Sequence, residues 1–452
     1  MILNKSIFKA YDIRGVYPSQ LNSKTAFFVG MAFAQKTKAK EVVIGRDMRL
    51  GGNVLKKSLM AGLSAGGVKK IIDIGLVPID AIYFAVGKLK HETGIMITAS
   101  HNPKEYNGFK MMAQKMKVVR GEQLFPLAQR LAELNSKKKN TKVKIVKENI
   151  WPGYIKHVLS FADIKKIKPF KVVVDAGNGM AGKVMPILTK KLPIKIIPLN
   201  FQLDSTFPAH PSNPLEPQSQ IQIVKKVKET KADCGVIFDG DTDRLFFVDE
   251  KGRFVPADIT LLILAEKFLE KEPGAGVVYN LICSKIIVEK VREWGGRPIR
   301  TAVGYVNVAE GMRKNKGIMG GELSAHYSFR DNSYADSGFI ALIILLELLS
   351  KKNKPLSEII KPLNKYYKLP EINTRFDKRE EMDGKIRQIK NNYKKYKQDC
   401  LDGVTVDSWD KGGWWFNLRA SNTEPLLRLT IESKNKTTAE KVKKEVLNIL
   451  AI

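Results

Sequence analysis

The sequence predicts an α/β fold divided over several layered domains. Short apolar runs that look like strands end in polar or glycine-rich loops at residues 41–47, 94–97, 172–175 and 234–238. Stretches of helical length and pattern, such as residues 259–269, alternate with them. This alternation is typical of sheets covered by helices. Because 452 residues are too many for one core, we expect three or four domains.

Breaks in the alternation indicate where the domains end. A Trp-Pro-Gly sequence at residues 151–153 interrupts the pattern near residue 150. We expect further boundaries near residue 255, before the helical run 259–269, and near residue 368, before a Leu-Pro pair. The last helix is expected to begin with the capping-box spacing from Thr437 to Glu440.

The charge balance allows two classes of protein. The chain has 77 Lys and Arg against 46 Asp and Glu, a formal net charge of +31. The basic residues are spread along the chain without interleaved aromatic residues, so we favour a solvated surface that attracts small anions. A protein that binds nucleic acid is the alternative, and retention on heparin at high salt without catalytic activity would favour it.

Cysteine content and hydropathy favour a cytoplasmic protein without membrane association. Cys234, Cys283 and Cys400 are odd in number and far apart, which argues against a disulfide framework. The first fifteen residues lack a signal-peptide pattern. The most apolar run, residues 339–349, is too short to span a bilayer and contains Glu347.

A polar loop after the apolar run 94–97 contains a candidate nucleophile. Here Ser100 and His101 follow the strand directly, and Lys110 lies close in sequence. We expect the loop to offer Ser100 to solvent beside positive charge, as an activated or phosphorylated serine requires. An ordinary turn, in which Pro103 stops the strand, is an equally good interpretation of this segment alone.

A second polar loop follows the strand-like run 234–238. It places Asp239, Asp241 and Asp243 at alternate positions, where three carboxylates would repel one another without a cation between them. Such oxygen ligands suit Mg²⁺ before Ca²⁺. A calcium EF-hand would use Glu250 at loop position 12, but it also needs flanking helices, and the flanks look like strands. A solvated acidic turn is the less favoured alternative.

Two further loops could bind a polar ligand. If the backbone is extended, Glu322, Ser324 and His326 point the same way and could grip hydroxyl groups. The segment 419–425 combines an arginine, hydroxyls and an amide in one turn, as binding of a phosphate dianion requires. Each of these two motifs is weak alone, since a polar sheet face or an ordinary loop has similar composition.

In this order and at these separations, the four loops resemble those of the α-D-phosphohexomutases, the phosphomannomutase and phosphoglucomutase family. The resemblance runs from residues 11–15 to the loop at 419–425. It implies three similar layered α/β domains and a smaller C-terminal α+β domain around a central cleft. We therefore expect residues 1–150 to hold the phosphoserine loop, 151–255 the metal loop, 256–367 the sugar loop and 368–452 the phosphate loop.

Within that family, the sugar loop is most similar to the phosphomannomutase type, with alanine after Ser324 and an aromatic-Arg-Asp tail at residues 329–331. The segments 207–208 and 213–215 suggest the same branch. Phosphoglucosamine mutases commonly have glycine after that serine and are the second candidate. Tyr305 and Ile282 stand where many relatives have histidine and lysine, which leaves the preferred sugar open.

The resemblance also implies a role for each loop. Ser100 would give its phosphoryl group to a hexose 1- or 6-phosphate, and the resulting 1,6-bisphosphate, which also primes the enzyme, would return its other phosphate. Asp239, Asp241 and Asp243 would hold Mg²⁺ against an oxygen of phosphorylated Ser100, with Arg244, His101 and Lys110 adding positive potential. Arg14 and Lys110 are the candidates for proton transfer. Substrate binding is assigned to Tyr11, Arg244, Glu322, Ser324, His326, Arg419, Ser421, Asn422 and Thr423.

Other polar residues are expected to be structural. We expect Arg46 and Arg49 to form surface ion pairs, and His157 and His210 to stabilise the fold. The expected partners are phosphorylated hexoses, with no nucleic acid, and the expected assembly is a monomer or a weak homo-oligomer.

Overall fold

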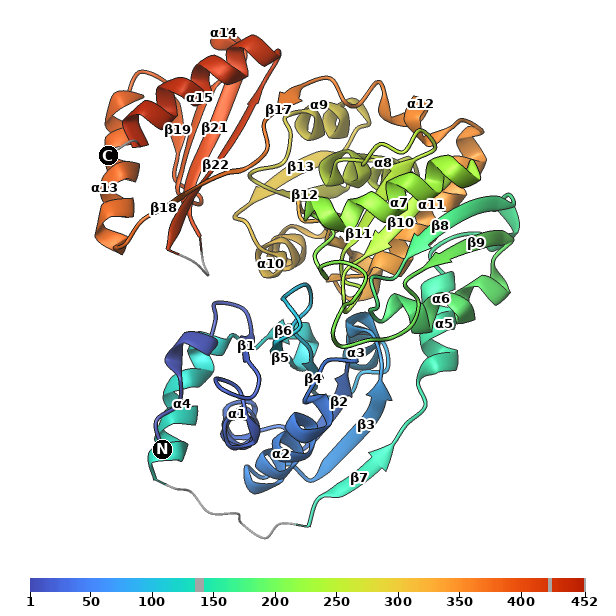
Figure 1. Ribbon diagram of the computed structural model, residues 1–452, viewed down its shortest axis with the longest axis vertical. Helices are drawn as coiled ribbons and strands as arrows, with labels where there is room; N and C mark the ends of the chain where they lie inside the picture. The colour runs from blue at the N-terminus through green and yellow to red at the C-terminus, as the bar shows by residue number, and fades with distance from the viewer. Residues whose placement is uncertain (135–141, 422–424, 451–452) are drawn as a thin grey trace.

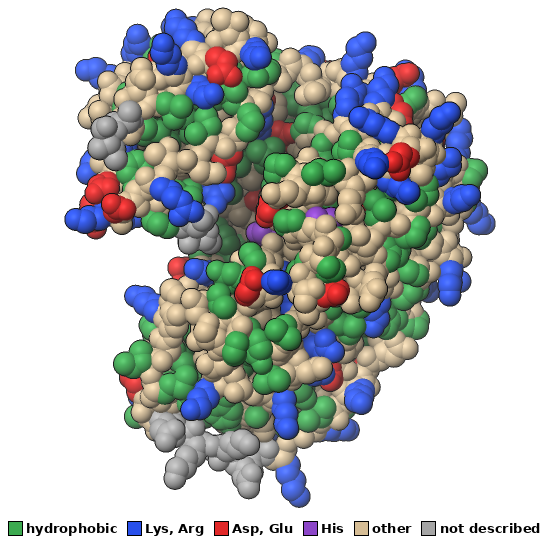
Figure 2. Space-filling model, in the orientation of Figure 1, with side chains coloured by type: hydrophobic (Ala, Val, Ile, Leu, Met, Phe, Trp, Pro, Cys, Tyr) green, Lys and Arg blue, Asp and Glu red, His purple; other side chains and the backbone are tan. Residues whose placement is uncertain are grey.

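Four sheets with their helices surround a hollow in the computed structural model, which describes residues 1–134, 142–421 and 425–450 (Figure 1). The hollow opens between the N-terminal and C-terminal parts of the molecule, and histidine and acidic side chains lie at its inner end (Figure 2). The expected α/β architecture is therefore present, and the loops between strands lead toward this hollow.

The first sheet flanks the lower side of the hollow in Figure 1. Its strands are β1 (Ile13–Val16), β2 (Glu41–Arg46), β3 (Lys70–Leu76), β4 (Gly94–Ile97), β5 (Tyr106–Ala113), β6 (Lys117–Val118) and β7 (Lys144–Lys147). They lie in the order β1-β5-β4-β2-β3-β7, with β6 beside β5. Because β2, β3, β4 and β7 are parallel, the carboxyl ends of β2 and β4 reach the same edge of the sheet.

Helices cover this sheet on both faces, so the middle of β2 is apolar and fully buried. The helices are α1 (Ser23–Thr37), α2 (Gly52–Ala65), α3 (Ile79–Gly87) and α4 (Gly121–Glu133), with short 3₁₀ turns η1 (Lys5–Ile7) and η2 (Gln114–Met116). Helices α1 and α2 cross where Gly62 meets the main chain of Phe27; a Cβ at Gly62 would lie 1.9 Å from that carbonyl oxygen.

The second sheet carries the expected acidic loop. Its strands are β8 (Phe170–Asp175), β9 (Ile194–Leu199), β10 (Cys234–Phe238) and β11 (Leu245–Asp249), in the order β11-β10-β8-β9. Its helices are α5 (Trp151–Leu159), α6 (Ala181–Leu188) and α7 (Pro217–Thr230), with 3₁₀ turns η3 (Ile164–Lys166) and η4 (Thr189–Lys191). The Trp-Pro-Gly sequence begins α5 instead of only breaking the pattern, since proline is well tolerated in a first helical turn.

The third sheet has the order β13-β12-β14-β15-β16. Its strands are β12 (Gly276–Asn280), β13 (Arg297–Thr301), β14 (Gly317–Gly321), β15 (Tyr327–Phe329) and β16 (Ala335–Asp336). Its helices are α8 (Ala257–Lys271), α9 (Ile286–Glu293), α10 (Tyr305–Asn315), α11 (Gly338–Lys352) and α12 (Leu356–Ile360), with the 3₁₀ turn η5 (Arg330–Asn332). The most apolar run of the sequence is the buried helix α11.

The fourth sheet is antiparallel and forms the upper left of Figure 1. Its strands are β17 (Tyr367–Lys368), β18 (Ile372–Arg375), β19 (Lys397–Asp399), β20 (Val404–Ser408), β21 (Trp414–Ala420) and β22 (Leu426–Ser433). The helices are α13 (Arg379–Asn392), α14 (Trp409–Gly412) and α15 (Lys436–Leu450). The cap of α15 is not the predicted Thr437: Asn435 Oδ1 accepts from the backbone N–H of Thr438 at 2.9 Å, because an Asn side chain three residues upstream reaches that donor.

Two kinds of contact hold the four units together. One apolar cluster runs through the first three units, from Val43 to Leu363, and the first unit has a second cluster of its own, from Leu3 to Ala132. In the part of the chain that the structure describes, the fourth unit shares no cluster with the others and has a core of residues from Leu369 to Leu450. The fourth unit meets the third through polar contacts, including Lys285 with Asp407 at 2.5 Å and Arg300 with Asp399 at 2.5 Å. Within the described residues, no helix combines the length and apolarity needed to cross a membrane.

Candidate active site

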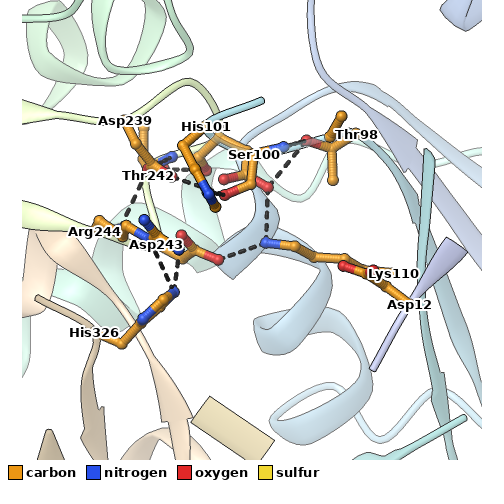
Figure 3. A network of polar contacts seen from close by, with 12 residues as sticks. Asp12, Thr98, Ser100, His101, Lys110, Asp239, Thr242, Asp243, Arg244 and His326 are labelled. Carbon is orange, nitrogen blue, oxygen red and sulfur yellow. Dashed lines mark hydrogen bonds and ion pairs between the residues drawn. The ribbon is translucent and has the colours of Figure 1, made fainter. Parts of the chain in front are cut away.

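Ser100 lies in the loop that follows β4, next to Asp239 and His101 (Figure 3). Its backbone is left-handed, with a φ of 51°. Its hydroxyl donates to Asp239 Oδ2 at 2.8 Å and lies 3.3 Å from His101 Nδ1. The expectation that the loop offers Ser100 to solvent is wrong, since only 1% of the residue is exposed. Ser100 is buried by a tertiary contact, because the acidic loop of the second sheet covers it.

The three aspartates of that loop lie together between β10 and β11. Asp239, Asp241 and Asp243 are buried, and one carboxylate oxygen of each lies within 4.8 Å of the others. Burial and the neighbouring charges of Asp243 and Asp241 raise the pKa of Asp239 well above its ordinary value. Burial also opposes charge on Asp243, but Lys110 and His326 hold its pKa well below the usual range.

Lys110, on β5, is the cation nearest to these carboxylates. Its Nζ lies 3.0 Å from Asp241 Oδ2 and 2.5 Å from Asp243 Oδ2. Burial opposes its charge, but the two aspartates raise its pKa above the ordinary value, so the ammonium keeps its proton. One ammonium does not satisfy the cluster: among the described residues, Asp241 Oδ1 is buried without a hydrogen-bond partner, and Asp243 Oδ1 has only His326 Nε2 beside it, at 3.4 Å. A buried carboxylate oxygen without a partner, next to two further carboxylates, fits a hard divalent cation.

His101 and Arg14 flank Ser100 from the first unit. Burial beside Arg244 and Arg14 lowers the pKa of His101 well below its ordinary value, so this imidazole is neutral at pH 7. His101 therefore does not add the positive potential that we expected. Arg14 is charged: burial opposes it, but Asp12 raises its pKa, and its side chain donates to Asp12 Oδ2 at 2.8 Å and to Asn102 Oδ1 at 2.6 Å.

The sugar loop predicted at residues 322–326 is a turn, not an extended strand. Ala325 has a left-handed φ of 65°, and its N–H donates to the Glu322 carbonyl at 3.0 Å. The three predicted side chains still meet, because the turn brings Ser324 Oγ to 3.0 Å from His326 Nδ1 and to 3.4 Å from Glu322 Oε2. The extended backbone expected here is therefore wrong, but the three side chains still lie together.

His326 connects this loop with the acidic loop. Its Nε2 lies 3.4 Å from Asp243 Oδ1 and 3.4 Å from Arg244 Nε (Figure 3). Burial opposes protonation, but Asp243 raises the pKa of His326 to about 10, so it is cationic at pH 7. The positive charge expected of His101 thus comes from His326.

Tyr11 bridges the first and third units beside the same cluster. Its hydroxyl donates to the Val303 carbonyl at 3.1 Å and accepts from Asn307 Nδ2 at 3.2 Å. Gly304 has a φ of 123°, and a Cβ there would lie 2.5 Å from the Tyr11 hydroxyl oxygen, so only glycine fits. Tyr305, which stands where many relatives have histidine, stacks on His326 at 5.7 Å between ring centroids.

Arg419 lies one residue before the end of β21 in the fourth unit. It is buried, and its Nη2 donates to Glu371 Oε2 at 2.9 Å, while Glu371 Oε1 accepts from Arg428 Nη1 at 2.9 Å. The backbone N–H of Ser421 donates to the Leu426 carbonyl at 2.8 Å, which closes the strand ends around the loop. Asn422 and Thr423 lie outside the described residues.

Sequence reasoning missed three residues of this region. Glu371 orients Arg419, and Asp336 has a carboxylate oxygen within 4.8 Å of ligand atoms of Asp243 and His326. Arg49 forms the expected ion pair, with Asp47 at 3.5 Å, but not at the surface: it is 2% exposed, because the serine loop folds over it. Only Asp336 had a sequence signal, as a carboxylate close to the sugar loop; the others depend on contacts between distant segments.

Family models match the four units in order. Those for phosphoglucomutase/phosphomannomutase α/β/α domains I, II and III match residues 5–137, 152–252 and 256–366, and that for the C-terminal domain matches residues 371–449. A protein named phosphohexose mutases from Xanthomonas campestris pv. campestris is 36% identical over 448 residues, 98% of each chain. A phosphomannomutase of Vibrio cholerae is 39% identical over 445 residues, 94% of each chain.

A solved structure supports the same assignment. The phosphoglucomutase/phosphomannomutase family protein from Burkholderia thailandensis superposes with a TM-score of 0.89 at 30% identity, over 99% of this chain and 98% of that one. The chain belongs to the phosphoglucomutase/phosphomannomutase family. The resemblance stated from the four loops, the four-unit α/β fold and the expectation of a mutase enzyme are confirmed.

Proposed function

We propose that the protein interconverts hexose 1-phosphates and hexose 6-phosphates through phosphorylated Ser100, with mannose phosphates preferred and glucose phosphates as further substrates. The observation that carries this proposal is the contact between Ser100 Oγ and Asp239 Oδ2 at 2.8 Å, inside a buried cluster of three aspartates and Lys110. A hydroxyl held against candidate metal ligands is what phosphoryl transfer to serine requires.

We propose Mg²⁺ as the ion of the aspartate cluster. The buried Asp241 Oδ1, which has no hydrogen-bond partner among the described residues, supports this choice. When bound by the three aspartates and an oxygen of Ser100, the ion would neutralise charge on the transferring phosphoryl group. We also propose that a hexose 1,6-bisphosphate first charges Ser100.

Charged side chains from two units would hold the transferring group. Lys110, Arg14 and His326 are cationic at pH 7 in this site, so they act by attraction and orientation. Arg14 and Lys110 keep their protons and are poor bases. His101 Nδ1 is neutral and 3.3 Å from Ser100 Oγ, but its lowered pKa makes it a weak base, and the Ser100 hydroxyl donates to Asp239 Oδ2 at 2.8 Å instead.

The remaining polar loops would bind the sugar. Glu322 and Ser324 would contact ring hydroxyls, with Tyr11 and Arg244 beside them. Arg419, Ser421, Asn422 and Thr423 would hold the distal phosphate, whichever end of the sugar carries it. One phosphate site for both orientations lets the bisphosphate turn between two transfers to and from the same serine.

A coupled assay tests the proposal. Mannose 1-phosphate, glucose 1-phosphate and glucosamine 1-phosphate are each supplied with the matching 1,6-bisphosphate, and intact-protein mass spectrometry counts phosphates on the enzyme. We expect turnover fastest with mannose 1-phosphate and one phosphate on the protein. Turnover of the glucosamine substrate alone would refute the assignment. We further propose a monomer or weak homo-oligomer in a reducing, cytoplasmic compartment, where Cys234, Cys283 and Cys400 stay free thiols.

A further inference from the structure

Arg49 lies beneath the serine loop and binds four of its carbonyl oxygens. Nη2 donates to the carbonyls of Ser100 and Asn102, both at 2.6 Å. Nη1 donates to those of Pro103 and Tyr106, at 2.8 and 3.1 Å. The loop therefore wraps around one guanidinium group, whose planar fork of donors matches several fixed acceptors at once.

The conformation of Ser100 explains why the loop needs such a support. A left-handed backbone is strained at a residue other than glycine, and Ser100 has a φ of 51°. The turn also directs the Ser100 carbonyl into the protein, where an acceptor without a hydrogen bond would be destabilising. Arg49 supplies the hydrogen bond that this buried carbonyl needs.

The second unit completes the socket around that carbonyl. Ser212 Oγ donates to the Ser100 carbonyl at 3.2 Å, and a Cβ on Gly240 would lie 2.7 Å from the same oxygen. The ring of Phe207 lies 4.9 Å from the Arg49 guanidinium carbon. Gly240 belongs to the acidic loop, so the support of Ser100 and the candidate metal ligands share one interface.

We propose that Arg49 is a positioning residue for phosphoryl transfer. It fixes the main chain of Ser100 against the second unit, which keeps Oγ aimed at the aspartate cluster. Arg49 acts through the loop and touches no reacting atom. This inference rests on the proposed role of Ser100.

The test compares Arg49→Lys with Arg313→Lys as a matched control. Arg313 also joins two units, donates to the carbonyls of Met116 and Ser333 and stacks on Tyr334 at 5.4 Å, but it belongs to the interface of the first and third sheets. For each variant, circular dichroism first confirms a folded protein at the assay temperature. Steady-state kinetics with hexose 1-phosphate follows, together with single-turnover phosphorylation of the dephosphorylated enzyme by hexose 1,6-bisphosphate.

We expect Arg49→Lys to lower kcat and the single-turnover rate about a hundredfold, the loss associated with a misplacement of about 1 Å. KM should stay within threefold, because the substrate contacts are unchanged. Arg313→Lys should keep kcat within threefold. A kcat for Arg49→Lys within threefold of wild type would overturn the inference.

A milder variant decides the matter if Arg49→Lys does not fold. Ser212→Ala removes one hydrogen bond to the Ser100 carbonyl and little volume. A fall in kcat of threefold or more with unchanged KM supports the inference, and a smaller fall overturns it. Ser100→Ala distinguishes a failure of the proposed function from a failure of the role of Arg49. Turnover in Ser100→Ala refutes the proposed function. An inactive Ser100→Ala beside a fully active Arg49→Lys refutes only the role of Arg49.

Discussion

Replacing Arg419 with alanine should weaken substrate binding about thirtyfold in both directions of the reaction. Arg419 is 5% exposed, its Nη2 is held by Glu371 at 2.9 Å, and its buried Nε has no hydrogen-bond partner within the described residues. A charge-assisted contact with a phosphate is worth about 2 kcal/mol. That energy corresponds to roughly thirtyfold in affinity. Both isomers should lose it equally, because one clamp would hold the distal phosphate in either orientation.

The fold should survive this change. Glu371 keeps Arg428 as a partner at 2.9 Å, so no carboxylate is left as an isolated buried charge. Calorimetric titration of hexose 1-phosphate and hexose 6-phosphate, in a Ser100→Ala background that prevents turnover, measures both affinities. Arg428→Ala is the matched control, since it removes the neighbouring charge from the same carboxylate, and we expect a change within threefold. Weakening toward one isomer only, or equal losses in the two variants, would refute the shared clamp.

The same variant tests whether the phosphate clamp closes the hollow. In solution scattering, bound hexose 1,6-bisphosphate should make the wild type more compact and leave the envelope of Arg419→Ala unchanged. The lobe that holds Arg419 faces the unit of Ser100 across the hollow, so a phosphate bound by both would draw them together (Figures 1 and 2). Equal compaction in both proteins would mean that the clamp does not drive closure.

Three further predictions follow from the site and its surroundings. Ser100→Ala should abolish turnover and remove the phosphate detected by mass spectrometry; full activity would contradict the role of Ser100. Treatment with EDTA, or Asp241→Asn, should lower kcat far more than substrate affinity, because the ion acts on charge that develops during transfer; kinetics indifferent to both changes would exclude a metal role for the aspartates. Burial raises the pKa of Asp80 from 3.8 to about 7, so the folded protein binds this proton more tightly than the unfolded chain, and stability should fall by at most about 4 kcal/mol as pH rises from about 4 to 7. Asp80→Asn should remove that fall in urea unfolding between pH 4 and 8, and an identical slope in the variant would contradict the assignment.

The sequence predicted the strands near the site well, because apolar runs bounded by polar loops carry local information. The expected runs at residues 94–97 and 234–238 coincide with β4 and β10. The grouping of the four loops came from resemblance to a family, since no local pattern specifies which loops meet. The domain boundaries near 150, 255 and 368 and the roles of the site residues stay predictions.

The errors share one physical cause, which is contact between segments far apart in the chain. Ser100 is buried by a loop 139 residues away, and Arg49 is buried by carbonyls about fifty residues away. The turn at Ala325 depends on a left-handed residue that is not glycine, which sequence patterns seldom reveal. Likewise, the protonation of His101 and His326 depends on which charges surround each ring after folding.

The separate core of the C-terminal unit has a consequence for how the protein unfolds. The apolar cluster from Val43 to Leu363 joins the first three units, one of which also holds the cluster from Leu3 to Ala132. The core from Leu369 to Leu450 is separate and adjoins them through ion pairs and the ring contact of Tyr366 with Trp409. Heating should therefore give two calorimetric transitions, a small one for the C-terminal unit and a large one for the rest. Between them the chain would keep its serine and aspartate loops but lose its phosphate clamp, so a protease acting on the warmed protein should remove residues after about 368 first.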